Sequence, residues 1–482
     1  MIALVEILFS KWNNNKIVYC HWKGNNHLED AMTEKSDFDI LISDKTFERG
    51  CELMEEIGLV HVQTQYGARF PGIQDWLGLD NSTGTMIHVH LHQKMIAGHS
   101  GIMEYILPWN ELAFAGRQKD SETGIYLINP NLEMILLYTR LGIEQSTKKM
   151  KKVKGGWELK EKTKNEIAYL KEHSSQSQIE LYAKTLYPDA YKELMEFISL
   201  DNMNGQDITH LFCFMKKTCK KWMRYSSLKV LWLSIYKPIE HRVRRKIYEG
   251  KQRGFYKKGL GTGKGLTIAF IGQDGAGKTT VTQQLLKWLS WKLDVRYVYL
   301  GSGDNYFSWK KSLIHRMSGK GPLRYIRAFL SLTDILDVSK KAYRNIKKAE
   351  KYAGRGGLVV YDRFPQMDYP GICDGPKIRV RLKKLFGNNA FSKLFLPLAK
   401  TEEKYIKKIT AHHPNVVIKL VLPPEESIRR KPQERLESVT RKHEIVKSLK
   451  FEHSDVYTLD ATMPFEEEIV LIKNIIWQHI QK

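Results

Sequence analysis

The stretch GQDGAGKTT, residues 272–280, follows an apolar strand-like run and precedes a helical sequence. It fits the pattern G-x-x-x-x-G-K-[ST] without a mismatch. Its glycines let consecutive backbone N–H groups point into one concavity, and the start of the helix adds a partial positive charge for a polyphosphate. Lys278 would reach the β- and γ-phosphates of a nucleoside triphosphate, and Thr279 would hold Mg²⁺. The residues expected to bind the nucleotide are Gly272, Gly275, Ala276, Gly277, Lys278, Thr279 and Thr280.

From Leu266 onward, short apolar runs alternate with helical patterns. The runs are LTIAFIG, VRYVYLG, GLVVYD, NVVIKLVL and DVYTLDA, and an apolar helical stretch closes the chain. Strands that alternate with helices in this way are typical of a parallel sheet covered by helices on both faces. The expected fold class of residues 265–482 is therefore α/β, built as a P-loop parallel sheet.

Charged residues follow two of these apolar runs. Asp362 and Arg363 stand at the carboxyl end of GLVVYD, on the side where open α/β sheets bind ligands. The aspartate can position magnesium or accept a proton, and the arginine can clamp an anionic acceptor. A structural salt bridge is the alternative. The segment 427–437 contributes Arg430 and Arg435, which suit a lid that closes over the transferring phosphate.

The elements GQDGAGKTT, YDRF, RRKPQERLE and the terminal LDAT resemble the thymidylate kinase family of P-loop kinases, over Leu266 to Lys482. The resemblance implies Mg²⁺-dependent phosphoryl transfer from ATP to a small phosphate acceptor. It places Asp274 near the acceptor's sugar, and it places magnesium and the acceptor phosphate at Asp362 and Arg363. The catalytic residues it implies are Lys278, Asp362, Arg363, Arg430 and Arg435, and the acceptor-binding residues are Asp274 and Arg363.

Two segments depart from the pattern of that family. Residues 299–303 read YLGSG where the family has an Arg-Glu-Pro-Gly acceptor motif. Pro365-Gln366 and Asp374-Gly375-Pro376 stand in its nucleobase region. These differences argue against thymidylate as the acceptor. A nucleoside monophosphate or a related phosphate- or sugar-bearing small molecule is expected instead.

The first part of the chain carries a second candidate site. In SDFDILI, Asp37 and Asp39 are two positions apart at the start of a strand, so both point to one face and can share divalent cations. Downstream, His88, His90 and His92 alternate in IHVHLH, so they share one face of another strand and can complete a metal or substrate site. The expected metal-binding residues are Asp37, Asp39 and His90. The alternatives are structural histidines and a vestigial, inactive domain.

The segment YCHWKGN precedes these carboxylates and contains Lys23, which can bind phosphate. It stands where a typical nucleotidyltransferase has a Gly-Ser turn. With the SDxD element and the strand that ends in LH, it resembles an uncharacterised nucleotidyltransferase-like family over about Lys16 to Gln145. The resemblance implies an α+β domain over residues 1–145 and nucleotidyl transfer coupled to the kinase reaction.

Residues 146–264 are lysine-rich and helical, and we expect them to form a basic connector between the two domains. Between Lys216 and Lys264 there are 16 lysines and arginines against only Glu240 and Glu249. Such a run favours an anionic membrane surface or a nucleic acid as partner. A solvated linker helix is the alternative.

The composition narrows the class of protein. The chain has 482 residues and a net charge of +24, and this length suggests two or three folded units. With 42% hydrophobic residues it is typical of a globular protein. Its five cysteines form no CxxC pair, which argues against a disulfide framework and against a zinc ribbon. No apolar run approaches the roughly 18 residues of a membrane span, and MIALVEILF does not read as a signal peptide, so we expect a cytoplasmic protein.

Two functions remain open at this point. The first is an ATP-dependent kinase of the thymidylate kinase type that is fused to a nucleotidyltransferase-like domain, acts on a small-molecule phosphate acceptor and is compatible with a homo-oligomer. The second is a regulatory or defence NTPase whose basic segment 216–264 binds nucleic acid and whose P-loop acts as a switch. Affinity for nucleic acid that falls steeply with salt would favour the second.

Overall fold

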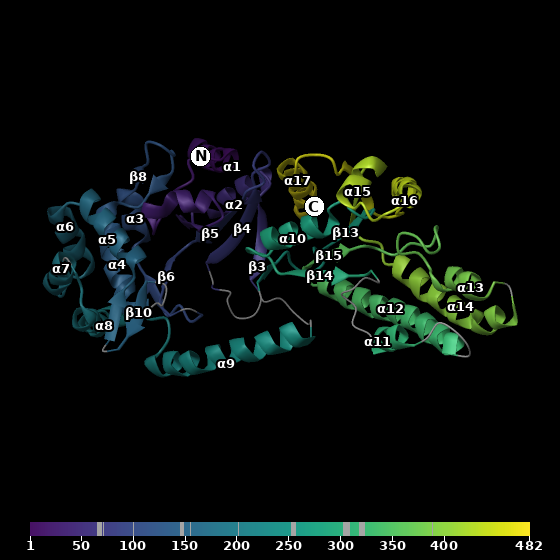
Figure 1. Ribbon diagram of the computed structural model, residues 1–482. Coiled ribbons are helices and arrows are strands. Elements are labelled where there is room, and N and C mark those ends of the chain that lie inside the picture. The colour runs from purple at the N-terminus through teal and green to yellow at the C-terminus, as the bar shows by residue number, and fades with distance from the viewer. Residues whose placement is uncertain are drawn as a thin grey trace. The chain divides into compact units, whose positions relative to one another are not determined.

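The computed structural model describes residues 1–64, 70, 72–99, 101–144, 149–154, 156–200, 202–251, 257–301, 309–317, 323–387 and 389–482. Within these ranges the chain forms two compact units, Met1–Lys251 and Gln252–Ile480 (Figure 1). The predicted domain boundary at Gln145 lies outside the described residues, as do Ser302 and Gly303 of the departing acceptor motif. Each unit has its own sheet and its own hydrophobic core.

The first unit combines a mixed sheet with helices. Its elements are α1 (Ala3–Asn14), β1 (Tyr19–His21), the 3-10 helix η1 (Asn25–Met32), β2 (Phe38–Ile42), α2 (Phe47–Glu56), β3 (Val60–Thr64), β4 (Ile73–Leu79), β5 (Met86–His92), β6 (Met95–Ala97), β7 (Tyr105–Leu107), α3 (Asn110–Gly116), β8 (Gln118–Lys119), β9 (Tyr126–Leu127), α4 (Pro130–Glu144), β10 (Met150–Val153), β11 (Gly156–Leu159), α5 (Glu161–His173), α6 (Gln176–Leu186), α7 (Tyr191–Ser199), α8 (Gly205–Thr218), the 3-10 helix η2 (Cys219–Trp222) and α9 (Ser227–Lys251).

The main sheet of the first unit runs in the order β3-β4-β5-β2-β1-β9-β8. β5 lies parallel to β2 on one side and antiparallel to β4 on the other. The register pairs His90 of β5 with Asp39 of β2 and with Asp75 of β4. Since directly opposed residues on neighbouring strands point to the same face, the sheet brings these three side chains together.

The helices expected to form a separate connector instead belong to the first unit. Side chains of α5, α6, α7 and α8 share one hydrophobic core with α3 and α4. The physical reason lies in α4, in which eleven of fifteen residues are buried. A helix that is apolar on nearly all sides has to be covered by other elements, and the lysine-rich helices cover it with their apolar stripes. The chain up to Lys251 therefore forms one unit with the N-terminal sheet, which differs from the predicted division at residues 146–264.

The second unit is a layered arrangement of helices around a sheet. Its elements are β12 (Lys258–Gly259), β13 (Leu266–Gly272), α10 (Lys278–Leu289), β14 (Val295–Tyr299), α11 (Trp309–Arg316), α12 (Leu323–Ala353), β15 (Leu358–Asp362), α13 (Ile378–Phe386), α14 (Ala390–Thr410), β16 (Val416–Val421), α15 (Pro424–Arg430), α16 (Leu436–Ser448), β17 (Asp455–Asp460) and α17 (Phe465–Gln481).

The sheet of the second unit has the order β14-β15-β13-β16-β17, and every neighbouring pair is parallel. Ala269 and Ile271 of β13 pack with side chains of α12 and α16. Successive side chains of a strand alternate between faces, and Ile268 and Phe270 are also fully buried, so both faces of the sheet are covered. This confirms the predicted mixed α/β class with a parallel sheet. The carboxyl ends of β13, β15 and β16 meet at one edge, where such sheets bind ligands.

Among the described residues, no helix is both long enough and apolar enough to serve as a membrane-spanning segment.

Candidate functional site

The loop between β13 and α10 adopts a conformation that depends on its glycines. Gly275 and Gly277 have φ angles of +87° and +79°, which side chains with a Cβ rarely adopt. A Cβ at Gly272 would lie 2.6 Å from the carbonyl oxygen of Leu420 in the adjacent strand. α10 begins at Lys278 directly after this loop, so its first backbone N–H groups have no partner within the helix and are available to an anion.

Lys278 is turned into the loop. Its Nζ donates hydrogen bonds to the carbonyl oxygens of Gly272 and Gln273, both at 2.7 Å. The side chain is only 7% exposed, and burial together with the neighbouring guanidinium of Arg363 lowers its pKa to about 8. An ammonium that is held by two neutral carbonyls can exchange them for phosphate oxygens, which bind it more strongly.

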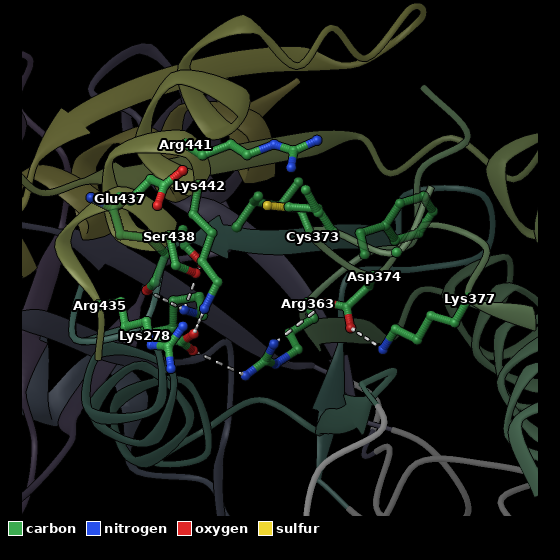
Figure 2. Close-up of a pocket in the computed structure, with 17 residues that line it drawn as sticks. Lys278, Arg363, Cys373, Asp374, Lys377, Arg435, Glu437, Ser438, Arg441 and Lys442 are labelled. Atoms are coloured by element: carbon green, nitrogen blue, oxygen red, sulfur yellow. Dashed lines mark hydrogen bonds and ion pairs between the residues drawn. The ribbon is translucent and has the colours of Figure 1, made fainter. Parts of the chain in front are cut away.

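Beside the loop lies a cavity of about 510 Å³ (Figure 2). Its lining includes three acidic and six basic side chains, so it suits a ligand with several negative charges. The basic residues are Lys278, Arg363, Lys377, Arg435, Arg441 and Lys442, and the acidic ones are Asp274, Asp374 and Glu437.

Asp274 connects the loop to α16 and to β15. Its Oδ2 lies 2.7 Å from Nζ of Lys442, and its Oδ1 lies 3.8 Å from Nη2 of Arg363. Burial opposes ionisation of this carboxyl, but the neighbouring cations hold its pKa below the ordinary value. Asp274 is therefore a carboxylate that positions two cations of the cavity.

Arg363 has a strained backbone directly after β15. Its φ of +70° is uncommon for a residue with a Cβ, and its N–H donates to the carbonyl of Phe270 at 3.1 Å. This conformation places the guanidinium between Asp274 and Asp374, whose carboxylates lie 3.8 and 3.6 Å away. Backbone strain of this kind clusters at ligand-binding sites, and here it aims a cation into the cavity.

Asp362 is buried next to Arg363, with 2% of its surface exposed. It accepts a hydrogen bond of 2.7 Å from the hydroxyl of Tyr297 on β14.

Arg430 is the last residue of α15 and lies beside the loop, without lining the cavity. It contacts the carboxylate of Glu426 at 2.9 Å, and it donates to the carbonyls of Gly275 and Ala461 at 3.4 and 3.1 Å.

The structure brings one part of the predicted set into the cavity. Gly272, Asp274, Lys278, Arg363 and Arg435 line it. The other predicted residues lie around the loop without being among the lining residues. They are Gly275, Ala276, Gly277, Thr279, Thr280, Asp362 and Arg430.

Sequence reasoning missed Lys377, Arg441 and Lys442 of the cavity lining. A signal for Lys442 was present, because it follows Arg435 at an interval of seven residues, which brings side chains back to one face of a helix. Arg441 lies three residues after Ser438, and both line the cavity from the same face of α16. Lys377 precedes α13 and had no such signal.

The second candidate site lies in the first unit. Asp39, His90 and His92 form a cluster whose ligand atoms are all within 4.8 Å of one another. Nδ1 of His90 lies 3.2 Å from Oδ1 of Asp39 and 3.2 Å from Nε2 of His92. Nζ of Lys23 lies 3.0 Å from the same Asp39 oxygen. Burial opposes ionisation of Asp39, but Lys23 and the two histidines hold its pKa well below the ordinary value.

Asp37 is engaged elsewhere. Its Oδ1 lies 2.8 Å from Nδ1 of His88, and Nε2 of the same imidazole lies 2.8 Å from Oδ1 of Asp75. The expectation that Asp37 and Asp39 share a cation assumed that both carboxylates point freely to one space. In the structure Asp37 contacts His88, and Asp37 is not a member of the cluster found among the described residues.

Comparisons with known proteins add relatives but no family assignment. No protein-family model matches the chain. The uncharacterized ATP-binding protein YghR of Escherichia coli K12 is 27% identical over 219 residues, which are 42% of this chain and 82% of the relative. The uncharacterized ATP-binding protein YghS of the same strain is 28% identical over 217 residues, which are 42% of this chain and 87% of the relative.

Among solved structures, deoxyadenosine kinase from M. mycoides with bound dATP aligns with 44% of this chain and 99% of its own, at 16% identity and a TM-score of 0.29. The same enzyme with its products aligns with 44% of this chain and 98% of its own, at 16% identity and a TM-score of 0.27. Similarity at this level carries no conclusion about this chain. This chain is thus similar to two curated proteins that are named as ATP-binding, while the thymidylate kinase subtype and the nucleotidyltransferase-like character of the first unit stay predictions.

Proposed function

We propose that the second unit transfers the γ-phosphoryl group of ATP to a small phosphate-bearing acceptor that binds in the cavity beside the loop. The observation that carries this proposal is the placement of Lys278 and Arg363 in one cavity, the first on the phosphate-binding loop and the second aimed there by a strained backbone. The names of the two curated relatives support ATP as the nucleotide.

The loop and α10 would hold the polyphosphate. Backbone N–H groups at the start of α10 point toward an anion, and Lys278 would leave its two carbonyl partners to contact the β- and γ-phosphates. Thr279 is exposed in the first turn of α10 and Asp362 ends β15, so these oxygens fit Mg²⁺, which would neutralise developing charge on the phosphates.

The acceptor would lie on the side of Arg363, Lys377 and Arg441. An oxygen of its phosphate attacks the γ-phosphorus, the bond from that phosphorus to the bridging oxygen breaks, and ADP leaves with the electron pair. Arg363 can bind two acceptor oxygens at once, and it holds the nucleophile in place. Arg435, at the start of α16, is positioned to contact the phosphate that moves between the two ligands.

The part of the acceptor beyond its phosphate would contact a second group of side chains. Asp374 and Lys377 line the main cavity and also a smaller one of about 220 Å³, which Lys311, Asp334 and Glu402 line as well. The other half of the lining of this smaller cavity is apolar and consists of Leu300, Ile335, Val338, Ala342, Pro365, Ile406 and Ile409. A mixed lining of this kind suits a sugar or a nucleobase, which combine hydrogen-bonding groups with an apolar ring face. A sugar phosphate or a nucleoside monophosphate is therefore the proposed class of acceptor.

An acceptor screen tests the proposal. The full chain is incubated with ATP and Mg²⁺ and with single sugar phosphates or nucleoside monophosphates, and the release of ADP is followed. One class of acceptor should accelerate release at least tenfold, and Arg363→Ala should remove that acceleration. Release of ADP that no acceptor changes, but that nucleic acid stimulates, would instead favour the regulatory NTPase.

A further inference from the structure

We infer that Asp39, His90 and His92 of the first unit bind one divalent transition-metal ion of the Zn²⁺ class. The three ligand atoms are Oδ1 of Asp39, Nδ1 of His90 and Nε2 of His92, and the distances between them are 3.2, 3.2 and 3.6 Å. A tetrahedral ion with bonds of about 2.0–2.1 Å requires ligand atoms roughly 3.3–3.4 Å apart. The spacing therefore matches three corners of such a polyhedron.

The type of ligand also separates this site from a magnesium site. Mg²⁺ prefers oxygen ligands and octahedral geometry, whereas two imidazoles and one carboxylate are typical of zinc and related ions. Nε2 of His90, on the far side of the ring from the ligand atom, lies 3.8 Å from the buried carboxylate of Asp75. The same Asp75 oxygen lies 2.8 Å from Nε2 of His88, so Asp75 adds negative charge behind the His90 ring without a hydrogen bond to it.

The sheet fixes the three ligands before any ion binds. His90 and His92 alternate on β5, and the register sets Asp39 directly opposite His90. The ring of His92 is fully buried and packs edge-on against Trp22, with ring centroids 5.1 Å apart. Because strands and a buried tryptophan hold the side chains, binding costs little conformational entropy.

Asp37 provides the decisive contrast. A nucleotidyltransferase-like site would use both carboxylates of SDxD on one or two cations, as the sequence predicts. In the structure the first carboxylate contacts His88 and only the second belongs to the cluster. The inferred site therefore depends on Asp39 and the two histidines, and not on Asp37.

Lys23 competes with the ion for Asp39. Its Nζ lies 3.0 Å from the ligand oxygen and 4.6 Å from the ring centre of Trp22. An ion with three protein ligands keeps an open fourth position. When the ion binds, the ammonium loses its carboxylate and lies next to this position, where it can contact an anionic ligand. Removing the ammonium should strengthen metal binding.

The test is metal binding to the full chain, with Zn²⁺ measured by calorimetry and Co²⁺ by its absorption spectrum. The wild type should bind one ion with a tetrahedral Co²⁺ spectrum, and an equal concentration of Mg²⁺ should not displace it. His90→Gln and Asp39→Asn should each weaken binding at least tenfold. The matched control Asp37→Asn should stay within threefold of the wild type, and Lys23→Met should bind more tightly.

Several results would overturn the inference. They are a well-folded wild type without a bound ion, binding that survives His90→Gln and Asp39→Asn, and loss of binding in Asp37→Asn equal to that in Asp39→Asn. The last result would instead support the two-carboxylate site. Circular dichroism of each variant shows whether the fold is intact, and the readout does not depend on kinase activity.

A second inference rests on α9. We propose that this helix binds an anionic membrane surface by lying in its plane. Seven large apolar side chains of α9 are between 40% and 80% exposed. They are Leu228, Leu231, Trp232, Ile235, Tyr236, Ile239 and Val243. Their spacing of three and four residues places them on one stripe of the helix, and an exposed stripe of this size marks an interaction surface.

The opposite face of α9 is the more covered one. Val230, Leu233, Lys237 and Glu240 recur at helical spacing and are all partly buried. Oε2 of Glu240 lies 3.3 Å from Nζ of Lys237. Among the described side chains of α9, this one carboxylate is therefore paired, and it lies on the face opposite the apolar stripe. Lys229 and Arg242 are exposed beside that stripe. The free surface of α9 thus presents apolar and basic groups together.

This combination favours lipid over nucleic acid. Phosphates of a nucleic acid would contact the basic residues but would leave the leucines and isoleucines in water. At an anionic bilayer the apolar stripe enters the boundary between headgroups and acyl chains, and the lysines and arginines contact the headgroups. The basic residues between Lys216 and Arg224, directly before α9, add to the same attraction.

The test is co-sedimentation of the full chain with vesicles of phosphatidylcholine, with or without phosphatidylglycerol. Only the anionic vesicles should bind the protein. The double variant Leu231→Ser with Ile235→Ser and the double variant Lys229→Gln with Arg242→Gln should each reduce the bound fraction at least fivefold. Leu181→Ser, which changes an exposed leucine of α6, is the matched control and should bind like the wild type.

Three outcomes would overturn this inference. The first is no binding to anionic vesicles. The second is RNA binding that is lost with the basic variant but kept with the apolar one. The third is a dimer of the free protein that Leu231→Ser with Ile235→Ser dissociates, since the stripe would then pair two copies of the chain.

Discussion

Nζ of Lys442 on α16 lies 2.7 Å from Oδ2 of Asp274 in the phosphate-binding loop. This ion pair joins α16 to the phosphate-binding loop, and both side chains line the cavity. Both side chains are about one quarter exposed, so the pair is partly screened by solvent.

The first prediction concerns this pair. The double variant Lys442→Met with Asp274→Asn should lose less unfolding free energy than the two single variants lose in sum. The difference, which is the coupling energy of the pair, should be about 1 kcal/mol because solvent partly screens the two charges. Chemical denaturation of the four proteins measures it. Strict additivity would show that the contact contributes nothing to holding α16 against the loop.

The second prediction concerns Lys278. Lys278→Ala should lower ATP turnover by about 10² or more, because it removes the cation that neutralises charge on the β- and γ-phosphates. The fold should survive, since the loop conformation depends on glycines. Lys287→Ala changes an exposed lysine of the same helix and serves as the control. Equal turnover in the two variants would contradict the assignment of residues 272–280 as the loop that binds the phosphates of ATP.

The third prediction separates Asp362 from Arg363 by kinetics. In the proposed function the carboxylate of Asp362 acts on magnesium and on the transition state, so Asp362→Asn should mainly lower kcat. The guanidinium of Arg363 is proposed to clamp the acceptor phosphate, so Arg363→Ala should raise KM for the acceptor more than KM for ATP. An unchanged acceptor KM in Arg363→Ala would contradict this role.

The fourth prediction uses the backbone of Arg363. Its φ of +70° costs an alanine about 1 kcal/mol or more but costs glycine nothing. Arg363→Gly should therefore be more stable than Arg363→Ala by about 1 kcal/mol, while both lack the guanidinium and are equally poor with the acceptor. Denaturation and steady-state kinetics of the two variants check both halves of this statement.

The fifth prediction is a pH dependence in the first unit. Glu133 on α4 is 3% exposed, and burial raises its pKa to about 7 although N–H groups of Gly24 and Asn25 contact it. Between pH 4.5 and 7 the folded chain keeps a proton that the unfolded chain has lost, so this group makes stability fall as pH rises through that window. The total change is on the order of 3 kcal/mol.

Glu133→Gln should remove this pH dependence, because the amide stays neutral at every pH. Thermal unfolding of both proteins is measured between pH 4.5 and 7.5. The quantity compared is the change of stability with pH in each protein, and not the stability of one protein against the other. The variant should lose less stability than the wild type as pH rises. Parallel curves would show that Glu133 does not carry the effect.

The sequence predicts well those features that are local in the chain. The loop, its helix and the alternating strands of the second unit follow from neighbouring residues, since a strand, glycines and a helix start must be consecutive. Arg363 was predicted from its position at the end of a strand, because the carboxyl ends of parallel strands meet at one edge. Asp274 was predicted from the resemblance to the thymidylate kinase family.

Features that depend on tertiary packing were predicted less well. Lys377 enters the cavity from the segment before α13, and the sequence identified the preceding Asp374-Gly375-Pro376 only as a departure from the nucleobase region of the resembled family. The connector was separated from the first domain because its lysines dominate its composition, whereas its buried residues pack against α4. Likewise, alternation places His88, His90 and His92 on one face, but only the strand register decides that Asp37 contacts the first and Asp39 the other two.

The central claim is that the cavity beside the loop receives a phosphate acceptor. Its most direct test follows ATP labelled in the γ-phosphate in the presence of the acceptor that the screen selects, with Lys278→Ala and Arg363→Ala in parallel. The account predicts label in the acceptor for the wild type and little label in either variant. Label that appears only as inorganic phosphate, at a rate that no acceptor changes, would contradict it.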